Sequence, residues 1–494
     1  MQRVRATARP FRAAILTVIT LLAYGVTPAP VSAATYPITW KACPEDAQVQ
    51  CGTMHVPADW KNPSGPAVML TIARRKATDP ARRLGALLVN PGGPGGSAVD
   101  FAFGATTFFG ADVRARFDII GVDPRGVGRS TPVLCSRDLV DAQPDPLITS
   151  QRAYDATIAH NRKLAADCAA RTGPVFPHVD TASVARDMDA VRAALGEQKI
   201  SFYGASYGTL IGQQYAQLYP ARLRALALDG VMDHSVDLNA FLTEETDAAE
   251  DAFHQFIAWC GRDPQCILRG QDVTKVWATA VSRARAGTLQ NPYDPPQPLT
   301  LSGLIGAAFA AFYEPQWYSF AYYLRDALAA KPTARSAPPP PVDLIDHSFP
   351  AVICEDWRLP ITSFGDLNGR LQTLARRSPK MLVSPLALAA VAGCLGWPSP
   401  PDNPQRPAPP PRTTAPILLV NSRHDPATAY PWAQRVTRQL GPRATLLTYD
   451  GWGHVIYSRS PCVATAIDKY LTTLAVPAAR TTCPKVDPQP FGVG

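Results

Sequence analysis

The feature that most constrains the fold of this chain is a series of six short, largely apolar runs. A strand buried on both faces of a parallel sheet is apolar throughout, whereas a strand with one face in solvent alternates between apolar and polar residues. Helical spacing separates several runs, for example over 183–195 and 209–218. The runs are 86–89, 117–122, 200–203, 225–228, 417–420 and 444–449. They predict a mostly parallel, doubly wound α/β sheet, opened by an antiparallel strand over 68–73.

About 190 residues separate the fourth run from the fifth, and their pattern is mostly helical. Helices are expected over 238–259, 273–286 and 317–329. An insertion of this kind between two strands of one sheet predicts a cap. We expect a first core segment over 35–232, a helical cap over 233–412 and a returning core segment over 413–494. The prolines of 338–341 and 398–411 are expected to form stiff connectors.

The first 34 residues have the layout of a signal peptide. Four arginines precede an apolar run over 13–26, and the small residues Val31-Ser32-Ala33-Ala34 follow. We expect cleavage after Ala33 or Ala34, because the run is shorter than the about 20 residues that span a bilayer. An uncleaved anchor is the alternative. The expected protein is secreted and extracellular, without membrane contact once the segment is removed.

The formal net charge of +8 includes the four arginines of this segment, so the mature chain would carry +4. Its basic residues are dispersed, and zinc-finger or basic-helix patterns are absent, which argues against a nucleic-acid partner. The chain also lacks metal-ligand spacing and cofactor motifs. We expect a monomer that uses neither a metal nor a cofactor.

Ten cysteines in an exported chain favour disulfides, because that compartment is oxidising. Many pairings are open, and short loop closure favours neighbours in the sequence. The expected pairs are Cys43–Cys51, Cys135–Cys168, Cys260–Cys266, Cys354–Cys394 and Cys462–Cys483.

The sharpest local motif is Gly204-Ala205-Ser206-Tyr207-Gly208, which directly follows the run 200–203 and precedes a helical stretch. A nucleophile on a tight strand-to-helix turn needs small neighbours, because a side chain at either glycine would collide with the sheet or the helix. The motif predicts Ser206 as the nucleophile of a hydrolase.

Addition to a carbonyl also needs hydrogen-bond donors for the developing oxyanion. The amide of Tyr207 is one candidate, and the glycine-rich loop 90–97 after the run 86–89 is expected to supply the other, from Gly93. A phosphate-binding loop would need a different pattern, and a merely flexible turn is the remaining alternative.

A serine nucleophile needs a base, and the base is oriented by a carboxylate. His454 follows the run 444–449, and Asp425 follows the run 417–420, which gives the chain order Ser, Asp, His. Asp229 and Asp233, after an earlier run, are the competing acids. His424 is expected to be a bystander.

A further loop, 123–130, follows the run 117–122 and contains Arg125. We expect it to form a tight turn that is held by its charged residues and supports the site. Substrate contact by Arg125 is the alternative.

Together these motifs resemble the prolyl-iminopeptidase-like branch of the α/β hydrolases, and within it the secreted tripeptidyl aminopeptidases of actinobacteria, with their characteristic C-terminal region. The likeness runs from about Trp40 to Cys483. It rests on 90–97, 123–130, the turn at Ser206, 228–231, 351–356, Asp425, His454 and the tail with Cys462, Tyr470-Leu471 and Cys483. Pro91 departs from the family pattern, which has histidine there.

The resemblance implies an α/β-hydrolase fold with a large helical cap, and cleavage of peptides near a free amino terminus. An ammonium group is expected to meet a carboxylate of the cap. Candidates are Glu355 and Asp356, together with Glu244, Glu245 and Asp247 on a cap helix. The alternative is that they are solvated or form ion pairs.

Fold and catalytic residues do not define the substrate. A carboxylesterase or amidase acting on a small molecule would use the same residues. A catalytically silent binding protein on the same scaffold is a further alternative, which the complete set of catalytic residues disfavours.

Overall fold

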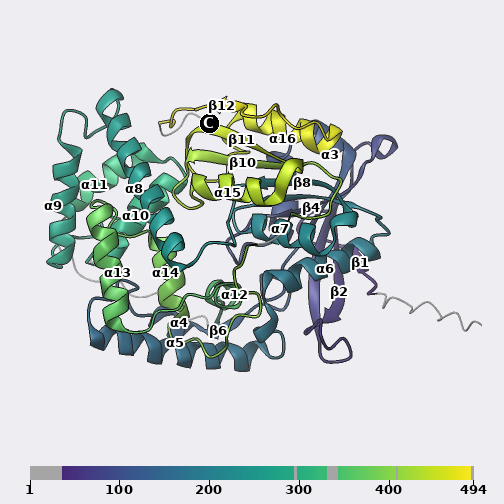
Figure 1. The fold of residues 1–494 in the computed structure, drawn as a ribbon, viewed down its shortest axis with the longest axis horizontal. Coiled ribbons are helices and arrows are strands. Elements are labelled where there is room, and N and C mark those ends of the chain that lie inside the picture. Colours follow the sequence, from purple (N-terminus) through teal and green to yellow (C-terminus); the bar gives the residue numbers. More distant parts are fainter. Residues whose placement is uncertain (1–35, 294–297, 331–342, 408–409, 491–494) are drawn as a thin grey trace, which may run out of the picture. The chain divides into compact units, whose positions relative to one another are not determined.

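A computed structural model describes residues 36–293, 298–330, 343–407 and 410–490 (Figure 1). The predicted signal peptide and the prolines 338–341 lie outside these ranges. Within them, the helices are too short or too polar to cross a membrane.

The centre of the fold is a ten-stranded sheet with the order β1-β2-β3-β5-β4-β7-β8-β10-β11-β12. Strands β1, β2 and β3 are antiparallel, β3 joins β5 antiparallel, and all pairs from β5 to β12 are parallel. The strands are β1 (Thr39–Ala42), β2 (Val49–Pro57), β3 (Ala67–Arg75), β4 (Gly85–Asn90), β5 (Phe117–Val122), β7 (Ile200–Ala205), β8 (Leu223–Asp229), β10 (Ile417–His424), β11 (Ala444–Trp452) and β12 (Thr482–Pro484). The predicted parallel sheet is confirmed; β12, too short to form an apolar run, was not predicted.

The apolar runs are continuous because both faces of the central strands are buried. Leu88 and Phe202 pack on one face, while Leu87 and Tyr203 pack on the other. The first face is covered by α6 (Thr181–Ala194), α7 (Gly208–Leu218) and α15 (Tyr430–Leu440), and the second by α1 (Ala98–Phe103), α3 (Ala111–Arg116) and α16 (Pro461–Thr473). This two-sided cover is what makes the sheet doubly wound.

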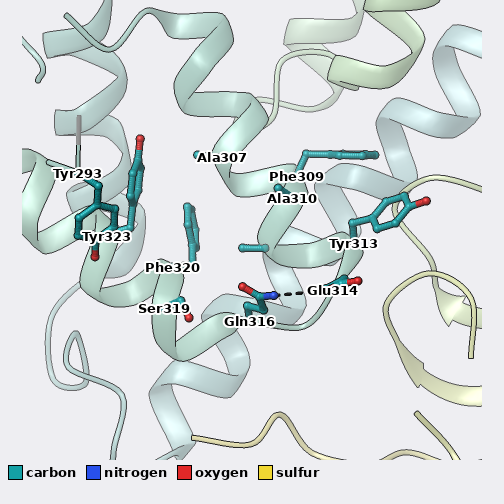
Figure 2. A pocket seen from close by; sticks show the side chains of 11 residues that line it. Tyr293, Ala307, Phe309, Ala310, Tyr313, Glu314, Gln316, Ser319, Phe320 and Tyr323 are labelled. Atoms are coloured by element: carbon teal, nitrogen blue, oxygen red, sulfur yellow. Dashed lines mark hydrogen bonds between the residues drawn. The ribbon is translucent and has the colours of Figure 1, made fainter. Parts of the chain in front are cut away.

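The chain between β8 and β10 is mainly helical, as expected for a cap (Figure 1). Its helices are α8 (Leu238–Arg262), α9 (Val273–Arg285), α10 (Leu301–Tyr313), α11 (Trp317–Ala329), α12 (Ser348–Asp356), α13 (Phe364–Arg377) and α14 (Pro385–Cys394). Helices α8 to α11 have an aromatic-rich core of their own, which also includes Ala427 and Trp452 from the core segment. A cavity of about 550 Å³ is lined by residues of α10 and α11 (Figure 2).

The segment between β5 and β7 packs against this cap. Its strand β6 (Leu134–Ser136) pairs with β9 (Leu344–Asp346), and its helix α5 (Gln151–Thr172) contacts α14. The buried amide of Asn161 in α5 donates to the carbonyls of Ala392 and Leu395 at the end of α14. Residues that precede Ser206 in the chain therefore help to hold the cap.

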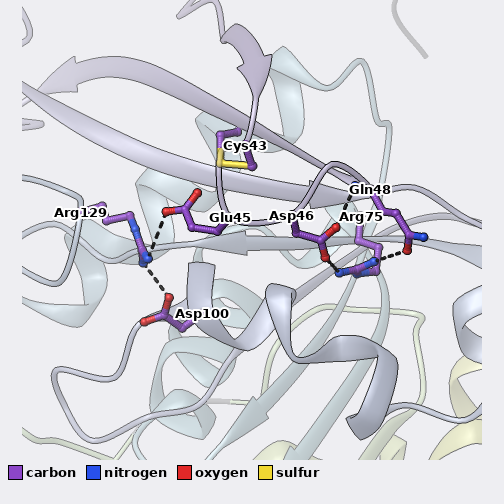
Figure 3. Close-up of a disulfide and its surroundings, with 8 residues drawn as sticks. Cys43, Glu45, Asp46, Gln48, Arg75, Asp100 and Arg129 are labelled. Carbon is purple, nitrogen blue, oxygen red and sulfur yellow. Dashed lines mark hydrogen bonds and ion pairs between the residues drawn. A yellow bond between two sulfur atoms is a disulfide. The ribbon is translucent and has the colours of Figure 1, made fainter.

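Five disulfides occur in the structure, and they join the five neighbouring pairs expected from short loop closure. Figure 3 shows Cys43–Cys51, which ties the loop between β1 and β2. In that loop Asp46 is paired with Arg75 of β3, and Glu45 lies 3.8 Å from Arg129. The disulfide thus closes the loop that adds charge contacts to the turn 123–130.

Candidate active site

Ser206 lies between β7 and α7 with a backbone φ of +55°, in the left-handed region that non-glycine residues rarely adopt. A Cβ at Gly204 would lie 2.4 Å from the carbonyl oxygen of Gly208, and a Cβ at Gly208 would lie 2.7 Å from that of Asn90. The backbone has no room for larger residues on either side of the turn. This geometry is that of a nucleophile elbow.

The glycine-rich loop after β4 touches the elbow through its backbone. A Cβ at Gly92 would lie 2.4 Å from the carbonyl oxygen of Ala205. The amide of Gly92 donates to Asn90 Oδ1 at 2.9 Å, whereas those of Gly93 and Tyr207 donate to no other group in the described residues. The Gly93 and Tyr207 amides, the predicted oxyanion donors, are thus not engaged by the protein.

The turn 123–130 holds the glycine-rich loop in place through hydrogen bonds. Asp123 accepts hydrogen bonds from the Ser97 hydroxyl at 2.7 Å and from the Val99 amide at 2.9 Å, at the start of α1. Arg125 is fully buried and donates from Nε and Nη2 to Asp187 at 2.7 Å. The buried contacts of Arg125 therefore stabilise the turn, in agreement with the structural role expected for this loop.

His454 follows β11 and is fully buried. Its Nδ1 lies 2.9 and 3.0 Å from the two carboxylate oxygens of Asp425. Asp425 also accepts the backbone amides of Ala427 and Thr428 at 2.9 Å and the Thr428 hydroxyl at 2.8 Å. Within the described residues His454 Nε2 is buried and makes no hydrogen bond. The acid is thus fixed by its own turn, and the other imidazole nitrogen is unengaged.

The competing acids make other contacts. Asp229 accepts the amides of Ile456 and Tyr457 at 3.0 and 2.9 Å. Asp233 accepts the hydroxyl of Ser235 and is paired with Arg435. The carboxylate in hydrogen-bond contact with His454 is that of Asp425.

Asp229 nevertheless links two parts of the site. Its backbone carbonyl accepts the amide of Ser206 at 2.8 Å, while its carboxylate holds the loop directly after His454. His424, the residue directly before Asp425, contacts Asp251 of α8 through Nδ1 at 2.6 Å. The bystander interpretation of His424 agrees with this contact.

Three of the predicted ammonium-binding acids already have protein partners. Glu244 is paired with Arg435, and Glu355 accepts the amide of Asp402 at 3.3 Å. Asp356 accepts the Tyr207 hydroxyl at 2.8 Å. Burial raises the pKa of Glu355 to about 8 and that of Asp356 to about 7. Asp356 supports Tyr207, the residue after Ser206. In the described residues, the hydrogen bonds and ion pairs of these three acids do not involve Ser206, Asp425 or His454.

Two further cap residues lie near the site: Glu245, which the sequence offered as a candidate carboxylate, and Tyr313, which had no recognisable sequence signal. Glu245 of α8 is buried, accepts the Ser384 hydroxyl at 2.8 Å, and has its pKa raised to about 8 by burial and, to a smaller extent, by the charge of Asp425. Tyr313, the last residue of α10, has its ring centroid 4.4 Å from that of His454. The position of Tyr313 at a helix end gives no pattern that would reveal its contact in advance. Thr428, in contrast, follows Asp425 by three residues, a spacing at which such a side chain can close a turn.

Tyr313 is one of the residues that line the cavity between α10 and α11 (Figure 2). Its walls are mostly apolar, and its polar groups include Glu314, whose side chain is 60% exposed. Glu314 Oε1 lies 3.8 Å from Arg459, and Gln316 donates to Oε2 at 3.2 Å. Within the described ranges, His, Cys, Asp and Glu side chains form no group of three or more that could hold a metal ion.

Four features together define an α/β hydrolase. They are a doubly wound parallel sheet, a serine on a strained turn after a central strand, a histidine hydrogen-bonded to a carboxylate after the later strands, and a helical insertion. Comparison with known proteins agrees: residues 380–483 match the family described as TAP-like protein. The chain is 30% identical to the serine protease Hip1 of Mycobacterium tuberculosis, over 90% of this chain and 91% of that protein. It is 29% identical to a tripeptidyl aminopeptidase of Streptomyces coelicolor (95% and 90% covered) and 33% identical to carboxylesterase B of M. tuberculosis (90% and 89%). The chain belongs to this family of TAP-like α/β hydrolases and is a hydrolytic enzyme.

Proposed function

We propose that the protein is a secreted serine exopeptidase that cleaves short peptides from a free amino terminus through an acyl-enzyme. The observation that carries the proposal is the hydrogen bond of 2.9 Å between His454 and Asp425, together with Ser206 on its strained turn. Two of the similar proteins described above are peptidases by name.

In the proposed mechanism His454 Nε2 takes the proton of Ser206 as the serine oxygen adds to the carbonyl carbon. The amides of Gly93 and Tyr207 donate to the oxyanion. His454 then gives the proton to the departing amine, and water hydrolyses the acyl-enzyme by the same steps in reverse order. Asp425 keeps the proton on Nδ1 and stabilises the imidazolium.

We place the substrate's amino-terminal part in the cavity between α10 and α11. The cavity volume of about 550 Å³ lies in the range of small-ligand sites, and Tyr313 connects it to His454. Glu314 is a carboxylate on the cavity wall that solvent reaches, although Arg459 and Gln316 also contact it. Glu244, Glu355 and Asp356 do not line this cavity and have partners elsewhere. We therefore propose Glu314 as the partner of the substrate ammonium group.

Secretion follows from the predicted signal peptide and is supported by the five disulfides, since such bonds persist in oxidising compartments.

The test compares three substrates of the mature protein: Ala-Pro-Ala-p-nitroanilide, its N-acetylated form and p-nitrophenyl butyrate. We expect hydrolysis of the free-amine anilide, loss of that activity on acetylation, and loss of all turnover in Ser206→Ala. Turnover retained by Ser206→Ala would refute the mechanism. Cleavage of the acetylated peptide at the same rate would refute the exopeptidase assignment.

The acidic partner is tested with Glu314→Gln, which we expect to raise KM for the free-amine peptide and leave butyrate hydrolysis unchanged. Glu244→Gln is the matched control, because it removes a cap carboxylate that is paired with Arg435. If only the control variant raises KM, the assignment moves to Glu244.

The second candidate is a carboxylesterase acting on a small molecule. The similarity to carboxylesterase B favours it. Hydrolysis of the butyrate alone, with no cleavage of either peptide, would establish this function instead.

A further inference from the structure

Tyr313, the last residue of α10, contacts His454 in two ways. Its carbonyl oxygen accepts the backbone amide of His454 at 2.9 Å, and its ring packs on the imidazole with centroids 4.4 Å apart. Its hydroxyl lies close enough to Ser206 for that side chain to lower the pKa of the phenol. A residue of the cap thus reaches the atoms that react.

The leaving group of the reaction is expected near this hydroxyl. His454 must take the proton of Ser206 and later deliver it to the leaving atom, so that atom lies between the serine oxygen and the imidazole. A hydroxyl close to the serine, on a ring that packs against the imidazole, lies next to the same place. Once the serine oxygen begins to bond to the carbonyl carbon, the leaving group becomes the neighbour of the Tyr313 hydroxyl.

The phenol stays in its neutral form at ordinary pH. Burial, with a smaller contribution from the charge of Asp425, raises the pKa of Tyr313 to about 12, although the Ser206 side chain opposes the shift. A neutral phenol can donate one hydrogen bond and accept others at the same oxygen.

We propose that Tyr313 is a catalytic residue for amide substrates: its oxygen accepts the N–H of the departing amine and thereby points the nitrogen lone pair at His454. The inference rests on the proposed role of Ser206. The bond from Ser206 Oγ to the carbonyl carbon has formed by then, and the serine proton is on His454 Nε2. As the C–N bond breaks, the nitrogen takes that proton from His454, the carbonyl re-forms, and Tyr313 keeps its own proton throughout.

An ester offers no N–H at the leaving atom, so this contact distinguishes peptides from esters. Tyr313→Phe removes the hydroxyl and retains the ring that packs on His454. The assay uses the p-nitroanilide and the p-nitrophenyl ester of the same tripeptide, Ala-Pro-Ala, and compares kcat/KM, which reports acylation for both. We expect the anilide value to fall about tenfold or more, the effect of one lost hydrogen bond in the transition state, and the ester value to stay within about twofold.

Equal losses for the two substrates would overturn the proposal, because a purely structural role of the hydroxyl affects both. An unchanged anilide value would overturn it as well. Tyr318→Phe is the matched control, since its hydroxyl donates to Asp263 at 2.7 Å in the same cap, away from the catalytic residues. Both substrates should be unaffected there. Failure of the proposed function is a separate result: it shows as wild-type protein inactive on the anilide, or as Ser206→Ala that keeps turnover.

Discussion

Replacing Asp425 by asparagine should remove catalysis and leave the fold in place. The side chain keeps its size, and one amide oxygen can still accept the backbone amides of Ala427 and Thr428. The NH2 group then takes the place of the oxygen that faces the Thr428 hydroxyl and His454 Nδ1. A donor opposite Nδ1 forces the imidazole proton onto Nε2, and such a histidine cannot accept the proton of Ser206.

The loss expected from the wrong tautomer is about 10⁴-fold in kcat, which corresponds to about 5 kcal/mol of transition-state stabilisation. The assay is steady-state hydrolysis of the best substrate, accompanied by the labelling rate with a serine-reactive fluorophosphonate and by the melting temperature. Asp233→Asn is the control, because it changes an equally buried acid that is paired with Arg435. Its kcat should change by less than about threefold.

Retention of more than about a tenth of wild-type kcat by Asp425→Asn would contradict the reasoning, because the tautomer argument requires a far larger loss. If Asp229→Asn then abolished activity while leaving the melting temperature unchanged, the orienting acid would be Asp229.

Three further predictions follow from the same geometry. Gly92→Ala should abolish labelling by the fluorophosphonate, since its Cβ would lie 2.4 Å from the Ala205 carbonyl at a φ of +89°; normal labelling would contradict the close approach. Ala310→Trp, on the cavity wall, should raise KM for the tripeptide and spare p-nitrophenyl butyrate, and equal KM values would place the substrate elsewhere. Glu245 has a folded-state pKa of about 8, above the usual 4.5, so its stabilising contribution is complete below about pH 4.5 and is lost as pH rises through 8. Urea unfolding across this range should show a smaller decline for Glu245→Gln than for wild type, and identical slopes would refute the raised pKa.

Much of the candidate site was predictable from the sequence, because its chemistry is tied to strand ends. In a parallel sheet the carboxyl ends of strands meet at one edge, so Ser206, Asp425 and His454, each just past an apolar run, are expected to converge. The glycines of the elbow carry the same local information, since Gly204 and Gly208 leave no space for a Cβ. Short loop closure likewise predicted the disulfide partners that the structure contains.

Sequence spacing does not predict contacts that depend on how elements distant in the chain pack together. It could not show that Glu244 and Glu355 would meet partners elsewhere, that Asp229 would hold the loop after His454, or that α5 would pack against α14. Helical periodicity records which face of a cap helix is apolar, but the direction in which the helix end points is decided by its neighbours. The sequence alone thus determined the sheet and predicted the residues that we propose as nucleophile, base and acid. Only the tertiary structure brought Tyr313 against them, because that contact depends on the packing of α10 over the core, more than 100 residues away from Ser206 along the chain.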